Sequence, residues 1–136
     1  MAILIDASIL IAYERGTLDL PVEMAGRSAS EVRLSVITVS ELLHGVSRAH
    51  DPTIRATRSA FVEHVLANFQ IVEISLETVR IHAPLWADLE HAGTPIGRHD
   101  SWLAATCLQY GLTMVTANER EFRRVPGLTI ENWSKT

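Results

Sequence analysis

The chain opens with MAILIDASILIAY, residues 1–13, and this stretch decides the fold. Residues 2–5 are apolar and partly β-branched, which predicts a short buried strand that ends at Asp6. The apolar residues 9–13 predict a helix directly after it, with Ser8 as the N-cap. A buried strand that leads straight into a helix is the unit from which parallel sheets are built.

The same unit recurs along the rest of the chain. Further strands are predicted at 32–37, 69–74, 112–116 and 128–130, helices at 38–46, 51–68, 75–93 and 99–110, a weak helix within 18–29 and a turn at 118–122. Most of the strands are continuous apolar runs, which is typical of a sheet covered by helices on both faces. We therefore predict an α/β protein, a three-layer α/β/α sandwich with a mostly parallel central sheet, in a single domain of residues 1–136.

Capping residues mark several of the predicted helix ends. Thr38 and Glu41 have the spacing of a capping box, and Asp51 followed by proline is typical of a helix start. Gly111 is expected to end the helix that starts at residue 99. Pro84 lies inside the predicted helix 75–93 and is expected to kink or divide it.

Composition narrows the class of protein. The 136 residues are 47% hydrophobic and carry a formal net charge of −4, which argues against a basic, sequence-independent DNA binder. Eleven of the twelve basic residues are nevertheless arginine, the side chain best suited to grip phosphate.

The single cysteine, Cys107, lies in an apolar run and is expected to be a buried hydrophobe. With no disulfide, signal peptide or membrane-length apolar run, we expect a cytoplasmic protein.

Three acids are predicted to lie at one edge of the sheet. Asp6 ends the first strand, Glu41 follows the second, and Asp100 starts the helix before the fourth. In open α/β sheets ligands bind beyond the carboxyl ends of the strands. Each acid also has a structural explanation, since Asp6 and Asp100 can cap or start helices and Glu41 can complete a capping box.

Taken together, these acids indicate a metal site. Carboxylates that lie close together repel each other and need protons or cations between them. All-oxygen ligands suit Mg²⁺ or Mn²⁺. The six histidines show no paired ligand spacing, and the sequence has no CxxC, phosphate-binding glycine loop or Gly-x-Ser-x-Gly motif.

The order of these motifs resembles the PIN-domain family, and within it the bacterial VapC-type toxins. The matching segments are residues 5–8, 40–42, 95–100, 104–105, 115–122, 125–128 and 131–133, so the resemblance extends over the whole chain. It implies an α/β/α ribonuclease in which Asp6, Glu41 and Asp100 bind Mg²⁺ or Mn²⁺. It also implies endonucleolytic cleavage of RNA, often transfer or ribosomal RNA, and inhibition of translation.

The resemblance further implies partners and supporting residues. VapC-type toxins form homodimers, and a cognate antitoxin protein occupies their acidic groove. The positions of Ser8 and Thr116 carry hydroxyl side chains that support the site. Hydrolysis of a phosphodiester needs an activated water and charge relief on the leaving oxygen, which one or two metal ions supply. No side-chain nucleophile is required.

The fourth acid is where the sequence departs from the simplest family pattern. Many PIN domains have Asp near the position of Asn118, which here is neutral. We predict that Glu121, just before an inward-facing Phe122, is the fourth ligand, that Asn118 orients its surroundings, and that Glu119 is solvated. The alternative is that this segment is only a polar loop.

Two other functions stay open at this point. Asp6 can be the phosphoacceptor of a phosphatase-like domain, although such a site is expected to have a second acid beside it and a late lysine in the sheet. The only lysine is Lys135. The chain can also be a catalytically inactive PIN module that only binds.

Overall fold

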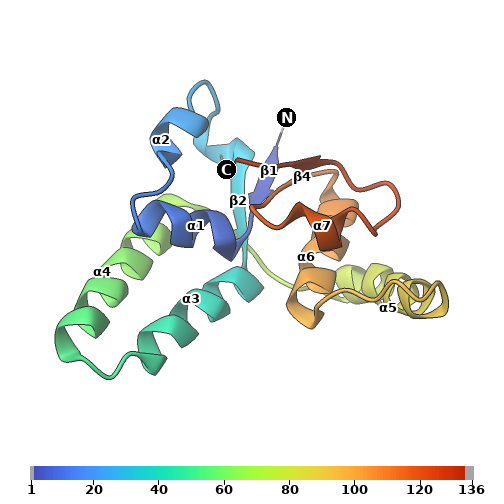
Figure 1. Cartoon of the computed structure of the whole chain (residues 1–136). Helices are drawn as coiled ribbons and strands as arrows, with labels where there is room; N and C mark the ends of the chain where they lie inside the picture. Colours follow the sequence, from blue (N-terminus) through green and yellow to red (C-terminus); the bar gives the residue numbers. More distant parts are fainter. Residues whose placement is uncertain (1, 134–136) are drawn as a thin grey trace.

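The computed structural model describes residues 2–133. The prediction of one domain includes residue 1 and residues 134–136, which lie outside the described residues. The strands form a single five-stranded sheet in the order β3-β2-β1-β4-β5, with every pair parallel (Figure 1). They are β1 (Ile3–Ile5), β2 (Val32–Ser35), β3 (Gln70–Val72), β4 (Thr113–Val115) and β5 (Ile130–Glu131). The predicted α/β class is confirmed, and the described sheet is wholly parallel.

Helices cover both faces of this sheet, as the apolar strands predict. One group comprises α1 (Ala7–Glu14), α2 (Leu20–Glu23), the 3-10 helix Ala29–Glu31, α3 (Val36–Arg48) and α4 (Pro52–Asn68). The other comprises α5 (Leu76–His91), α6 (Arg98–Tyr110) and α7 (Glu119–Phe122), on the opposite side in Figure 1. No helix among residues 2–133 is long and apolar enough to cross a membrane.

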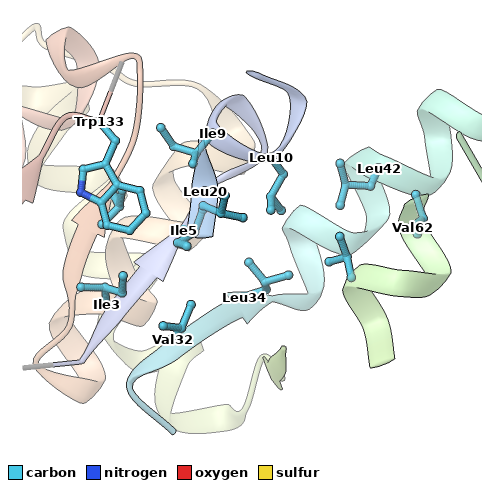
Figure 2. Packing of buried hydrophobic residues seen from close by; sticks show 12 residues of the cluster. Ile3, Ile5, Ile9, Leu10, Leu20, Val32, Leu34, Leu42, Val62 and Trp133 are labelled. Atoms are coloured by element: carbon cyan, nitrogen blue, oxygen red, sulfur yellow. The ribbon is translucent and has the colours of Figure 1, made fainter. Parts of the chain in front are cut away.

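The side chains of the central strand β1 belong to two separate hydrophobic cores. Ile3 and Ile5 point into a cluster with the first helix group, which Figure 2 shows together with Leu34 and Trp133. Leu4 points the other way, into a cluster with α5, α6 and α7. All three β1 side chains are at most 1% exposed. This burial on both faces explains why the strand reads as an uninterrupted apolar run.

The strand order places a crevice at one defined position. From β1 the chain moves outward through β2 to β3 and then returns to β4 on the other side of β1. Connections therefore leave the carboxyl ends of β1 and β4 toward opposite faces, which opens the ligand-binding crevice typical of α/β sheets. Asp6 follows β1 and Thr116 follows β4, so both lie at this switch point.

Two predicted helix starts are wrong by a few residues. α1 begins at Ala7 with Asp6 as its N-cap, because the Asp6 side chain accepts from the Ser8 backbone N–H. β2 ends at Ser35, two residues earlier than predicted, and Ser35 caps α3 by accepting from the Ile37 N–H at 3.0 Å. The predicted capping box of Thr38 and Glu41 is therefore absent. Both residues lie inside α3, with Glu41 in its second turn.

Other predicted boundaries are confirmed. The Asp51 carboxylate caps α4 by accepting from the N–H groups of Thr53 and Ile54. Gly111 ends α6 in the left-handed region, at φ 66°, which a residue with a side chain adopts only with strain. The predicted division at Pro84 is wrong, because α5 continues through the proline without interruption. Its packing along α6 supports the helix on both sides of the proline.

Candidate acidic active site

Asp6 is held rigidly at the switch point. Its backbone N–H donates to the Val115 carbonyl at 3.1 Å, which continues the pairing of β1 with β4. Its Oδ1 accepts from the backbone N–H and the hydroxyl of Ser8, at 3.1 and 2.5 Å, and its Oδ2 accepts from the Thr116 hydroxyl at 2.6 Å. The side chain is only 5% exposed. Burial raises the pKa of Asp6 above its ordinary value, and these hydrogen bonds oppose the rise.

Ser8 and Thr116 connect Asp6 to the loop after β4. The Ser8 Oγ accepts from the Ala117 N–H at 3.0 Å, and the Thr116 Oγ1 accepts from the Asn118 N–H at 2.9 Å. Each hydroxyl therefore donates its single proton to Asp6 while it accepts from this loop. Asn118 takes part through its backbone, while its side chain is exposed.

Glu41 reaches the same crevice from α3. Its side chain is 33% exposed, and its Oε1 lies 3.4 Å from Nδ1 of His99 on α6. Burial is the main cause that raises the pKa of Glu41, the nearby His99 opposes it, and the charge of Asp6 raises it further. The influence of Asp6 on Glu41 shows that α3 and β1 bring their acids to one site.

Asp100 and Glu121 form a carboxyl pair between α6 and α7. Burial, a hydrogen bond to Glu121 and the charges of Glu121, Asp6 and Glu41 together raise the pKa of Asp100 to about 7. The same hydrogen bond is the main cause that lowers the pKa of Glu121. The pair therefore retains one proton up to about pH 7, since ionisation of both carboxyl groups brings mutual repulsion.

The backbone of Gly97 lies beside this pair. Its N–H donates to the Glu121 Oε2 at 3.4 Å, and a Cβ at this position would lie 3.4 Å from Asp100 Oδ2 and 3.6 Å from the Glu121 oxygen. A Cβ here would therefore make only ordinary van der Waals contact with the two carboxyl groups. The backbone instead supplies a donor to the carboxyl that carries the charge.

The donor chemistry of the four acids fits a hard divalent cation. The charges of Asp6 and Glu41 act on each other and on Asp100, and a hydrogen bond joins Asp100 to Glu121, while the role of the four acids as metal ligands stays a prediction. Among residues 2–133, however, no three Asp, Glu, His or Cys side chains already surround one point as ligands. The proton shared by Asp100 and Glu121 relieves part of the repulsion that a bound cation would relieve.

Glu119 and Glu121 have opposite surroundings, which makes them a matched pair for a test. Glu119 forms an ion pair with Arg123 at 2.9 Å on the outside of α7, whereas Glu121 faces Asp100. We expect Glu121→Gln to weaken metal affinity and reduce the rate of cleavage by tenfold or more, about 1.4 kcal/mol of barrier. Glu119→Gln should have little effect. Metal titration of the cleavage rate measures both, and a damaging Glu119→Gln with a silent Glu121→Gln would contradict the assignment.

The structure adds two residues that the sequence reasoning did not select. His99 contacts Glu41, although the histidines lack metal-ligand spacing; its position directly before Asp100 was the available signal. Thr38 is fully buried one turn before Glu41, and its hydroxyl has no hydrogen-bond partner within residues 2–133. No sequence pattern distinguishes such a hydroxyl from a satisfied one.

Comparison with known proteins identifies the family of the chain. The PIN domain family model matches residues 3–128. The chain is 34% identical to "Ribonuclease VapC1" of Rickettsia felis over 96% of this chain and 95% of that protein. It is 31% identical to a "tRNA(fMet)-specific endonuclease VapC" of Salmonella typhimurium over 78% of both.

A solved structure supports the same grouping. The structure of DNA-bound VapBC from Salmonella typhimurium superposes with a TM-score of 0.86 at 27% identity, and the match covers 98% of both chains. The predicted resemblance, in fold and in sequence, is thereby confirmed. The chain belongs to the PIN-domain family and groups with its VapC-type members.

Proposed function

We propose that the protein is an endoribonuclease that requires Mg²⁺ or Mn²⁺ and acts as the toxin of a toxin–antitoxin pair. The observation that carries the proposal is the set of four coupled carboxyl groups at the switch point of a PIN-domain sheet. Relatives of the chain are named ribonucleases, and one is named for tRNA(fMet), which supports RNA as the substrate and transfer RNA as the first to test.

Each residue of the site has a role in this proposal. Asp6, Glu41, Asp100 and Glu121 would hold the cation, which would stabilise charge on the phosphodiester and lower the pKa of the attacking water. Ser8 and Thr116 fix both oxygens of Asp6, and through Thr116 the Asn118 backbone holds the loop after β4 in place. The water is the nucleophile, so RNA products with a 5′-phosphate are expected.

The buried state of Asp6 favours this role over that of a phosphoacceptor. A phosphoryl group is much bulkier than a metal ion, and it would have to approach a side chain that is 5% exposed and whose two oxygens already accept hydrogen bonds. Phosphorylation of the purified protein by small phosphodonors would favour the alternative. Binding of RNA without any cleavage in Mn²⁺ would favour an inactive PIN module.

The test of the activity is cleavage of purified transfer RNA and ribosomal RNA by the full chain after treatment with EDTA. We expect no cleavage until Mg²⁺ or Mn²⁺ is restored, and then internal cuts whose downstream products carry a 5′-phosphate. Cleavage that continues at full rate in excess EDTA would contradict metal dependence. Products that begin with a 5′-hydroxyl would contradict water as the nucleophile.

The proposal extends to partners and to the cell. We propose that the chain acts in the cytoplasm as a homodimer and that a cognate antitoxin covers the acidic crevice with a basic side chain. Produced alone, it should stop growth by inhibiting translation, and co-production of the antitoxin should restore growth. Normal growth during strong production of protein that cleaves RNA in vitro would contradict the toxin role.

The shared proton gives a prediction for pH. Because the pKa of Asp100 is raised from 3.8 to about 7 on folding, its contribution to stability is fully present below about 4 and is lost as pH rises through about 7. The raised pKa values of Asp6 and Glu41 act in the same direction. We expect the melting temperature in EDTA to fall as pH rises from about 5 to about 8.

Metal binding should show the opposite trend. A cation competes with the proton on the Asp100–Glu121 pair, so affinity for Mn²⁺ should increase up to about pH 7 and then level off. Calorimetry in buffers of different ionisation enthalpy measures the released proton. The Asp100→Asn variant is the control, because it should lose both the binding of Mn²⁺ and the release of this proton. Equal affinity for Mn²⁺ at pH 5 and pH 8 would contradict the prediction.

A further inference from the structure

A small groove lies beside Glu41, between α1, α3 and α4, and it is rich in arginine. Its volume is about 100 Å³. Arg15 from the end of α1, Arg48 from the end of α3 and Arg58 from α4 line it, and so does Glu41 itself. Three guanidinium groups from three helices therefore share one concavity with an acid of the candidate active site.

Basic residues outnumber acidic ones in the lining of this groove, three to two. Among residues 2–133, neither Arg15 nor Arg48 has a carboxylate within salt-bridge distance. Glu14 is the only acid besides Glu41 in the lining. The protein as a whole carries a net charge of −4, so a groove with three arginines is a local basic cluster on an acidic protein. Unpaired guanidinium groups in a concavity favour an anionic ligand.

Part of the groove is fixed in shape before any ligand arrives. Arg58 is half-buried, and its Nη1 donates to the Gly45 carbonyl of α3 at 3.1 Å. The apolar side chains of Leu42 and Val62 lie between α3 and α4 at the same place (Figure 2) and also line the groove. A low-dielectric floor beneath the arginines strengthens their attraction for an anion.

We propose that this groove binds a backbone phosphate of the RNA substrate that neighbours the phosphodiester to be cleaved. The inference rests on the proposed function and deepens it. An acidic centre repels a polyanion, so a nuclease needs a cationic surface next to it to hold the chain. Because Glu41 lines both the groove and the crevice, a strand bound here is directly beside the four carboxyl groups. Arg15 and Arg48 are the phosphate ligands, and Arg58 adds a fixed third charge.

The test measures RNA affinity as a function of salt. Arg15→Gln and Arg48→Gln are compared in an Asp6→Asn background, in Mg²⁺, with a short single-stranded RNA oligonucleotide as the probe. Loss of one phosphate contact should reduce the slope of log affinity against log salt by about 0.7 and weaken binding about fivefold at 0.1 M salt. Since both side chains are exposed and have no carboxylate within salt-bridge distance in the described part of the chain, the melting temperature should stay unchanged.

Arg55→Gln is the matched control. Arg55 lies on α4 three residues before Arg58, is exposed and does not line the groove. The Arg55→Gln substitution removes the same charge from outside the groove. The dependence of its RNA affinity on salt should therefore equal that of the parent protein. With Asp6 restored, Arg48→Gln should raise KM for the oligonucleotide and leave kcat unchanged, which a merely structural effect would not do.

Two results would overturn the inference while the proposed function survives. In the first, Arg55→Gln weakens binding as much as Arg15→Gln and Arg48→Gln, so only overall charge matters. In the second, the groove variants bind RNA like their parent but lose affinity for the antitoxin, so the groove is a protein contact. If the unaltered protein neither binds nor cleaves RNA, the proposed function itself fails and the inference falls with it.

Discussion

Replacing Asp6 by Asn is expected to abolish measurable RNA cleavage, with a loss of at least about a hundredfold, or roughly 2.7 kcal/mol of barrier. Asp6 is the acid that the structure holds most firmly, through two contacts to Ser8 and one to Thr116. An amide keeps a carbonyl oxygen for the N-cap of α1, since Asn caps helices about as well as Asp. It removes the negative charge that a cation and its neighbouring acids depend on.

The thermal stability of the Asp6→Asn variant should not fall together with its activity. Burial raises the pKa of Asp6, which means that the folded protein disfavours its charge. Asp6→Asn removes that buried charge and its repulsion of Glu41 and Asp100. We therefore expect an unchanged or higher melting temperature in EDTA together with the lost activity. A merely misfolded variant would lose both.

Asp51→Asn is the matched control for this change. Asp51 caps α4 in the same way that Asp6 caps α1, with its carboxylate accepting from backbone N–H groups, but it is exposed and has no contact with the acidic crevice. Its cleavage rate should equal that of the unaltered protein. Full activity of Asp6→Asn in EDTA-treated, metal-restored samples would remove Asp6 from the site.

Phe122→Ala is expected to lower the free energy of unfolding by about 3–5 kcal/mol. Phe122 is completely buried and belongs to the core cluster that contains Leu4, Leu103 and Met114. It is also the buried residue of the four-residue helix α7, which is too short to persist without packing. Truncation leaves a cavity and releases the segment that carries Glu121.

Urea unfolding at two levels of Mn²⁺ measures this effect. Tyr110→Ala is the matched control, because that aromatic side chain is 45% exposed and its loss should cost little. Because α7 positions Glu121 beside Asp100, Phe122→Ala should also weaken the affinity for Mn²⁺ under conditions where the variant is folded. A stability within 1 kcal/mol of the unaltered protein would show that Phe122 does not anchor α7.

Much of the fold follows from the burial pattern alone. The continuous apolar run around Leu4 requires a sheet covered on both faces, and Leu4, Leu34 and Met114, one from each of three neighbouring strands, are fully buried. Parallel strands then bring the carboxyl ends of all the strands to one edge of the sheet. For this reason Asp6, Glu41 and Asp100 could be predicted from the sequence to lie at the same edge. The placement of Glu121 beside Asp100 agrees with the predicted fourth ligand, while its role in metal binding stays a prediction.

The remaining details depend on contacts between distant segments. Ser35 and Thr38 are both acceptable N-caps by sequence, and the choice depends on where β2 stops pairing with β3 at Val72. The bond between Thr116 and Asp6 joins residues that are 110 positions apart. The proton shared by Asp100 and Glu121 arises from the approach of α6 and α7. No local sequence pattern encodes the contacts between these distant segments. The sequence therefore predicts where the acids lie but not which of them is protonated.

The most direct test of the account is to measure Mn²⁺ binding and RNA cleavage in the same samples of the full chain, from no metal to saturation. We predict that the cleavage rate follows the fraction of protein with bound Mn²⁺. We also predict that Asp6→Asn and Asp100→Asn lose both Mn²⁺ binding and RNA cleavage. These predictions would be contradicted by full cleavage in samples that hold no bound metal, or by variants that bind Mn²⁺ as tightly as the unaltered protein does.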